Sequence, residues 1–250
     1  MCRKWFGTQP VVSLSLCAAD KINNPKAAAM LHSESEPRLY RFSRLLCGVF
    51  THLLCAAFTV FVAILAKPGS SLFSWHPFLM TLAFSFFMTE AILLFSPHSS
   101  PVGKLKHQVK SRLHWLLQCS CVSCALVGLG TIFYNKHVNG KPHFSTWHAL
   151  LGLVTVCVVV LQSVAALPLM YHKLAKGWSL AKLKRYHAAA GLVTYLLGCV
   201  SLLLGVSSTW FTSSVGGNAW YITALCPALS ALTIMSQVTN AYMAKKRLQS

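Results

Sequence analysis

The chain has 250 residues, of which 55% are hydrophobic and 10% are charged, and its mean hydropathy is +0.56. A soluble globular domain is more charged and less apolar, so this composition indicates an integral membrane protein. The formal net charge of +18 does not indicate a nucleic-acid-binding protein, because the basic residues lie between the apolar segments. Most of the ten cysteines lie inside those segments, which favours helix contacts over a disulfide framework or a zinc site.

Six apolar segments are long enough to cross a bilayer, for which a helix needs about 20 residues. They span roughly residues 45–66, 72–95, 113–134, 147–170, 186–208 and 219–243. We therefore predict an all-α membrane protein with six transmembrane helices in one domain, residues 38–247. Residues 1–37 contain Asn-Asn-Pro and Ser-Glu-Ser-Glu-Pro runs, which predict a disordered cytosolic arm.

The loop charges predict the orientation in the membrane. Nineteen of the 22 basic residues precede the first span, follow the last, or lie between spans 2 and 3 or spans 4 and 5. The other loops hold only Lys67, Lys136 and Lys141. By the positive-inside rule, both termini and the two basic loops are cytosolic.

A histidine lies beside an aromatic residue near the start of each of the four central spans. The four pairs are Trp75-His76, His114-Trp115, Trp147-His148 and Tyr186-His187. Because consecutive helices run in opposite directions, the first and third histidines are expected near the outer face. The second and fourth are expected near the cytosolic face.

In an up-and-down bundle, alternate helices lie diagonally across the core. This pairs His76 with His148 and His114 with His187. Each pair can bind one haem iron from both sides, which leaves no site for dioxygen and favours electron transfer. The sequence thus predicts a central four-helix bundle holding two b haems. Interfacial histidines without a cofactor are the alternative, but four in successive spans favour a functional role.

Three further polar or small-residue features lie within the spans. Gly152 and Gly191 each follow a predicted ligand by one helical turn, which leaves room for a planar ring. We interpret His52 in the first span mainly as a packing residue. Glu90 either relays protons or pairs with a lysine of the cytosolic loop, since an unpaired carboxylate in a span is costly.

The motifs Phe73-Ser74-Trp75-His76-Pro77, Leu113-His114-Trp115, Trp147-His148 and Leu183-Lys184-Arg185-Tyr186-His187 resemble those of the cytochrome b-561 family. The resemblance covers about residues 38–247 and is greatest for the subgroup called cytochrome b-561 domain-containing proteins. It implies a homodimeric transmembrane reductase with two b haems and cytosolic ascorbate as electron donor. The implied acceptor on the other side is ferric iron or the monodehydroascorbate radical. We expect an endomembrane, such as the endoplasmic reticulum or a vesicle, rather than the plasma membrane.

The candidate substrate contacts are the basic residues at the two faces. Better-known members of the family have a Tyr-x-x-Arg stretch after the second helix, where this chain has Leu-Leu-Phe-Ser-Pro-His at 93–98. The remaining candidates for ascorbate or haem propionates on the cytosolic side equally suit the positive-inside rule, and they are Arg112, Lys182, Lys184 and Arg185. On the outer side, Lys141 and His143 are candidates for the acceptor site.

Two other functions stay open at this point. The protein can be a haem-bearing subunit or sensor that passes electrons only to a partner protein. It can also be a histidine-gated transporter without haem, which His52 and Glu90 motivate. Haem stoichiometry separates the transporter from the other two, and electron transfer from enclosed ascorbate to external ferricyanide separates the reductase from the subunit.

Overall fold

The computed structural model describes residues 38–175 and 177–247, and within these residues the regular structure is entirely helical. The predicted arm, residues 1–37, lies outside the described residues. Residues 44–239 form one compact unit. The described part of the second unit consists of residues 38–43 and 240–247. Within it, Asn240 Nδ2 donates to the Tyr40 hydroxyl at 3.2 Å.

Six helical segments in the described part of the chain are long and apolar enough to cross a membrane, which confirms the predicted fold class. The first, third and sixth are α3 (Arg38–Ala66), α6 (His107–Val138) and α11 (Gly217–Arg247). The second is α4 (Leu72–Thr81), a π-helical turn η1 (Leu82–Phe87) and α5 (Met88–Leu93). The fourth is α7 (Trp147–Ala165) with α8 (Leu167–Met170), and the fifth is α9 (Leu180–Val206). The short elements are η2 (His172–Leu174) and α10 (Thr209–Ser214).

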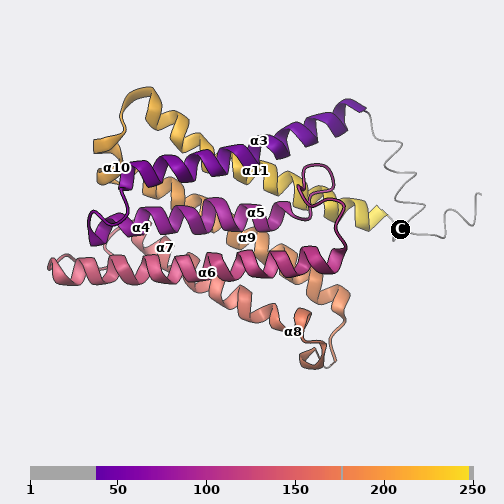
Figure 1. Ribbon diagram of the computed structural model, residues 1–250. Coiled ribbons are helices and arrows are strands. Elements are labelled where there is room, and N and C mark those ends of the chain that lie inside the picture. The colour runs from indigo at the N-terminus through magenta and orange to yellow at the C-terminus, as the bar shows by residue number, and fades with distance from the viewer. Residues whose placement is uncertain (1–37, 176, 248–250) are drawn as a thin grey trace, which may run out of the picture. The chain divides into compact units, whose positions relative to one another are not determined.

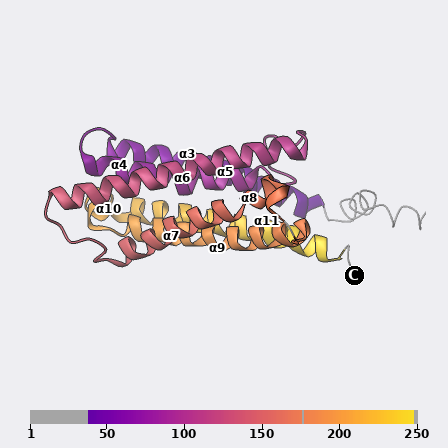
Figure 2. The same cartoon turned by 90° about the horizontal axis from the view of Figure 1, so that it is seen from below.

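The helices that carry the four predicted ligands form the centre of the residue 44–239 unit. α4 packs along α6 and α7 packs along α9, and η1 contacts both α6 and α9. Seen from below, α4, α5 and α6 form one layer, and α7 and α9 form another (Figure 2). Consecutive spans are therefore neighbours, as expected of an up-and-down bundle.

Side-chain caps fix where two of the ligand-bearing helices begin. Ser71 and Ser74 form a reciprocal capping box at the start of α4, and the Thr146 hydroxyl accepts from the Ala149 amide at the start of α7. Each cap satisfies amides that have no helical partner. His76 and His148 consequently lie within the first turns of their helices, at the end of the bundle where α4 and α10 lie in Figure 1.

Candidate functional site

The first histidine pair joins α4 to α7. The ring centroids of His76 and His148 are 6.2 Å apart, with an interplanar angle of 76°. His76 Nδ1 lies 3.0 Å from the Gly128 carbonyl of α6, and His148 Nδ1 lies 3.1 Å from the Ser201 carbonyl of α9. Because a carbonyl oxygen only accepts, both Nδ1 atoms carry the hydrogen. Both Nε2 atoms are therefore left with a lone pair for a metal.

The second pair joins α6 to α9. The rings of His114 and His187 are 6.1 Å apart, with an interplanar angle of 82°. His114 Nδ1 lies 2.9 Å from the Ala91 carbonyl. The Phe95 amide bonds to Ile92 rather than to Ala91 at the end of this span, so the Ala91 carbonyl is one of the terminal carbonyls left without a helical partner. Ending α5 here creates the acceptor for His114.

His187 is held differently from the other three histidines. Its Nδ1 lies 3.0 Å from the side-chain amide of Gln162 on α7, and the same amide donates to the His187 carbonyl at 2.8 Å. Sequence reasoning missed Gln162. A polar side chain in the middle of an apolar span was the available signal, because such groups are rarely kept in a membrane without a partner.

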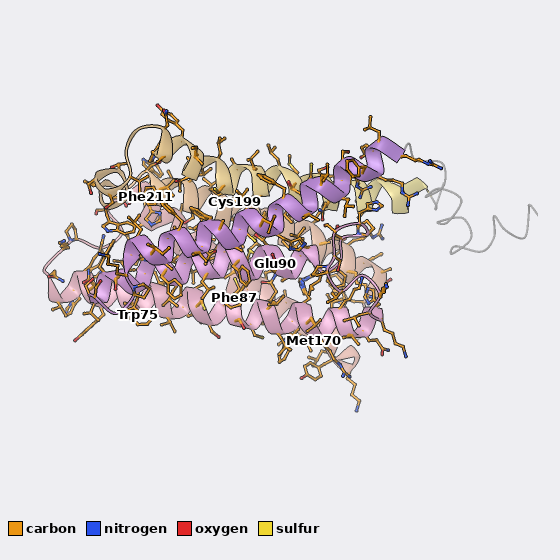
Figure 3. All side chains as sticks on the ribbon, turned by 45° about the horizontal axis from the view of Figure 1, so that its top comes forward. Trp75, Phe87, Glu90, Met170, Cys199 and Phe211 are labelled. Atoms are coloured by element: carbon orange, nitrogen blue, oxygen red, sulfur yellow. The ribbon has the colours of Figure 1, made fainter. Side chains whose placement is uncertain are left out.

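The two pairs lie toward opposite ends of the bundle. Trp75, beside His76, and Met170, at the end of α8, are at opposite ends in Figure 3. We call the end with His76 and His148 the outer end and the end with His114 and His187 the inner end, after the predicted topology. The inner end carries the four predicted basic contacts, all exposed: Arg112, Lys182, Lys184 and Arg185.

A cavity of about 280 Å³ opens at the outer pair. Both histidine rings and the two glycines Gly152 and Gly205 form part of its lining. A Cβ atom added to Gly205 would lie 3.3 Å from His148 Cε1, so this glycine allows the ring to approach α9. The predicted Gly152 lines the cavity, whereas a Cβ at Gly191 would meet Gln162 Nε2 at 3.5 Å.

The two outer acceptor candidates are placed differently. His143 lines the cavity and stacks on Phe133, with centroids 4.2 Å apart. Lys141 is exposed and lies outside the lining. Lys136 is part of the lining, and its Nζ donates to the Pro142 carbonyl at 3.0 Å. In the sequence, Lys136 was counted only among the basic residues that indicate the membrane orientation. The sequence does not reveal that the following loop folds back over the end of α6.

Glu90 pairs with His52, not with a loop lysine. His52 Nδ1 lies 2.9 and 2.8 Å from the two carboxylate oxygens, and the side chains are 19% and 16% exposed. His52 thus forms a hydrogen-bonded pair with Glu90 between α3 and α5 and is not a packing residue alone. Figure 3 labels Glu90 on the part of α5 that lies against α3.

Residues 75–212 match the family described as eukaryotic cytochrome b561. The chain belongs to the cytochrome b561 family. The match covers more than half of the chain and includes all four paired histidines, whereas His52 lies before it. Cytochromes of the b type bind haem, so the family agrees with the chemistry predicted for the histidine pairs.

Relatives in the family have names that describe reductases. The chain is 52% identical over 219 residues to transmembrane reductase CYB561D2 of Bos taurus, covering 88% of this chain and 99% of the relative. It is 53% identical to the protein of the same name from Homo sapiens, with the same coverage. A more distant relative, lysosomal membrane ascorbate-dependent ferrireductase CYB561A3 of Mus musculus, is 28% identical over 56% of this chain and 57% of its own length.

Proposed function

We propose that this protein carries single electrons from cytosolic ascorbate to an acceptor on the other side of a membrane. The acceptor is monodehydroascorbate radical or ferric iron. His76 with His148 and His114 with His187 would each hold one haem b. The names of the relatives support the reductase activity, and the ascorbate-dependent ferrireductase supports the class of donor and acceptor.

The two ring separations carry this proposal. A first-row metal ion bonds an imidazole nitrogen at about 2 Å, so two opposite ligands bring their ring centroids to about 6 Å once a ring radius of about 1 Å is added on each side. The observed separations are 6.2 and 6.1 Å. Both pairs therefore fit a metal held between them, and haem b is the group that the family name implies.

A haem held by each histidine pair would supply a one-electron carrier. The surrounding residues orient the ligands. The carbonyls of Gly128, Ser201 and Ala91 each receive an Nδ1 hydrogen, which fixes the rings and increases the electron donation from Nε2. Gly205 keeps the space beside the His148 ring free of a side chain.

The basic residues at the inner end form the proposed donor surface. Arg112 lies two residues before His114, and Arg185 lies two residues before His187. With Lys182 and Lys184 they surround the inner pair with exposed positive charge, which attracts the ascorbate anion or pairs with haem propionates. They take the place of the Tyr-x-x-Arg stretch that this chain lacks.

The proposed acceptor site lies at the mouth of the outer cavity. His143 and Lys136 line the cavity that contains His76 and His148, so an anionic acceptor or chelated ferric iron bound there lies close to the outer pair. Lys141, exposed on the same loop, adds positive charge at this mouth. We also propose that both termini face the cytosol, that the protein lies in an endomembrane and that it forms a homodimer.

The first test replaces one histidine at a time. We expect His76→Ala and His148→Ala to lose the outer haem only, and His114→Ala and His187→Ala to lose the inner haem only. The haem-to-protein ratio and the reduced-minus-oxidised spectrum of purified protein measure this. His107→Ala is the control, because His107 is exposed on the same helix as His114. Loss of the same haem from His76→Ala and His114→Ala would contradict the pairing.

The second test separates the reductase from a subunit that acts only with a partner protein. Liposomes containing the purified protein are loaded with ascorbate, and ferricyanide is added outside. Reduction of the external ferricyanide, absent from empty liposomes and from His148→Ala liposomes, supports the reductase. Ascorbate-reducible haem without transfer would indicate the subunit, and protein with no haem would remove both in favour of the transporter.

A further inference from the structure

Residues from three segments meet at the inner end of the bundle around Glu90. His52 of α3 contacts both carboxylate oxygens through Nδ1, and its Nε2 lies 3.1 Å from the Ser99 carbonyl. Ser99 lies in the loop between α5 and α6, where its hydroxyl donates to the Ser96 hydroxyl at 2.8 Å. Cys55 Sγ, one turn along α3 from His52, donates to Glu90 Oε1 at 3.3 Å.

This geometry requires an extra proton. The Ser99 carbonyl only accepts, so His52 Nε2 must carry a hydrogen. If His52 is neutral, its Nδ1 has a lone pair and the Glu90 carboxyl must be protonated; if Glu90 is ionised, Nδ1 must carry the hydrogen. In both cases the His52–Glu90 pair holds one proton more than a neutral imidazole and a free carboxylate. Loss of that proton would set a lone pair against a carboxylate.

The pair is directly connected to the inner histidines. Glu90 immediately precedes Ala91, whose carbonyl accepts the Nδ1 hydrogen of His114. The next residue on the other side, Thr89, is fully buried, and its hydroxyl lies 3.0 Å from the Tyr195 hydroxyl of α9. Glu90 is thus adjacent in the chain to the residue that accepts from His114. The side chains of His52 and Glu90 are only 19% and 16% exposed, and charges in such surroundings interact more strongly than in water.

We propose that the His52–Glu90 pair binds the proton released when ascorbate is oxidised at the inner end. The proposal rests on the function proposed above. Ascorbate monoanion loses one electron and one proton to give the monodehydroascorbate radical anion. The observed contact is that of the protonated pair. In the oxidised protein the pair would have released this proton to the cytosol, and it would take up the proton of ascorbate as the electron enters the inner haem, so that the added negative charge is offset locally. The Ser99 loop connects the pair to the cytosolic surface.

The other titratable groups around the pair do not replace it. Cys55 donates to the carboxylate, and Tyr195 faces Thr89 rather than Glu90. Arg44 of α3 and His98 of the loop are also engaged in interactions. Among the described residues of the inner end, His52 and Glu90 share a proton in a partly buried contact, and we therefore assign to them the uptake linked to reduction.

The test measures the midpoint potential of each haem between pH 5.5 and pH 8.5 in purified full-length protein. Redox mediators and dithionite are used, so the result does not depend on ascorbate. As pH rises the pair loses its proton and reduction is disfavoured. We therefore expect the reduced-to-oxidised ratio of the inner haem to fall by up to tenfold per pH unit, about 59 mV for one electron. The outer haem should change much less.

Glu90→Gln keeps the shape and hydrogen bonding of the side chain but cannot titrate, so it should flatten the inner slope while both haems remain. His52→Gln should do the same. Thr89→Val is the matched control, since it removes a buried hydroxyl next to Glu90 and should keep the wild-type slope. A flat inner slope in the wild type, or a wild-type slope in both Glu90→Gln and His52→Gln, would overturn the proposal.

A kinetic measurement separates proton transfer from electron transfer. Ascorbate must give up a proton, whereas the dithionite radical gives only an electron. Glu90→Gln should therefore slow reduction by ascorbate about 100-fold or more, judged from the usual contribution of a positioned acid or base, and leave reduction by dithionite unchanged. Equal slowing by both reductants would contradict the inference. Protein without haem, or wild-type haem that ascorbate does not reduce, would contradict the proposed function instead.

Discussion

A histidine that binds iron through Nε2 keeps its hydrogen on Nδ1, and the group that accepts this hydrogen tunes the ligand. His76, His148 and His114 use backbone carbonyls, which mutation cannot remove. His187 Nδ1 faces the side-chain amide nitrogen of Gln162, which only donates, so the amide must turn over for its oxygen to accept an Nδ1 hydrogen. The inner pair therefore has one partner that can be changed without altering a ligand.

Replacing Gln162 should affect the inner haem alone. Gln162→Leu removes the amide that lies against both Nδ1 and the carbonyl of His187. Loss of such a partner commonly weakens metal binding by about 10- to 100-fold, so we expect weaker retention of the inner haem during purification and a shifted inner midpoint potential. Ser163→Ala is the control, because Ser163 bonds only to the Val159 carbonyl of its own helix. A change in the outer haem would contradict the assignment.

The glycines at the outer cavity offer a second comparison. In Gly205→Ala, the new Cβ lies 3.3 Å from the His148 ring, which cannot move away without losing the Ser201 carbonyl. Overpacking of this kind costs about 1–3 kcal/mol, so outer haem affinity should fall roughly 5- to 150-fold. Gly130→Ala is the control outside the cavity lining, where the new Cβ meets nothing within 4 Å, so both haems should stay. Haem titration of apoprotein distinguishes the two variants.

The sequence allowed the pairing of the four histidines to be predicted better than the surroundings of these residues. The four histidines follow a pattern repeated in four spans, and helix parity paired them correctly in space. The His52–Glu90 contact joins residues 38 positions apart in the chain, and only one member lies in the central bundle. No periodicity or charge rule predicts such a contact, because it depends on how α3 packs against α5.

The second span shows the same limit for a whole element. Its length and apolar content were predicted, but the π-helical turn η1 at Leu82–Phe87 was not. A π turn accommodates one residue more than an α turn, so it sets the position of Ala91 relative to His76 along one continuous span. Hydrophobicity alone does not reveal it, since every residue in the turn suits an α-helix in a membrane.

Single-residue deletions test this interpretation of η1. Deleting Ser85 removes one residue from the wide turn, which can close to an α turn while α4 and α5 keep their orientation. We expect both haems to be retained. Deleting Val122 from α6 rotates His114 by about 100° relative to the Gly128 carbonyl, because an α-helix has 3.6 residues per turn. That variant should lose at least one haem, and retention of both would contradict the role assigned to α6.

For the molecule as a whole, the two pairs at opposite ends of the bundle would make the proposed electron transfer sensitive to the membrane potential. Moving one elementary charge across 100 mV changes the free energy by about 2.3 kcal/mol, which is about fifty-fold in an equilibrium constant. Outside-positive potential favours outward electron flow. A carrier confined to one leaflet would respond much less. The sign and size of the response therefore report whether electrons cross the full bundle.

Proteoliposomes with a potassium diffusion potential provide the measurement. Ascorbate is enclosed, and the external acceptor is a couple whose midpoint potential is close to that of ascorbate, so that both forms are present at equilibrium. We expect the external reduced-to-oxidised ratio to rise about fifty-fold for each 100 mV positive outside. Collapsing the potential with an ionophore should abolish the shift, and His148→Ala should abolish the transfer itself. If the external reduced-to-oxidised ratio at equilibrium did not depend on the membrane potential, the two histidine pairs would not connect the two faces.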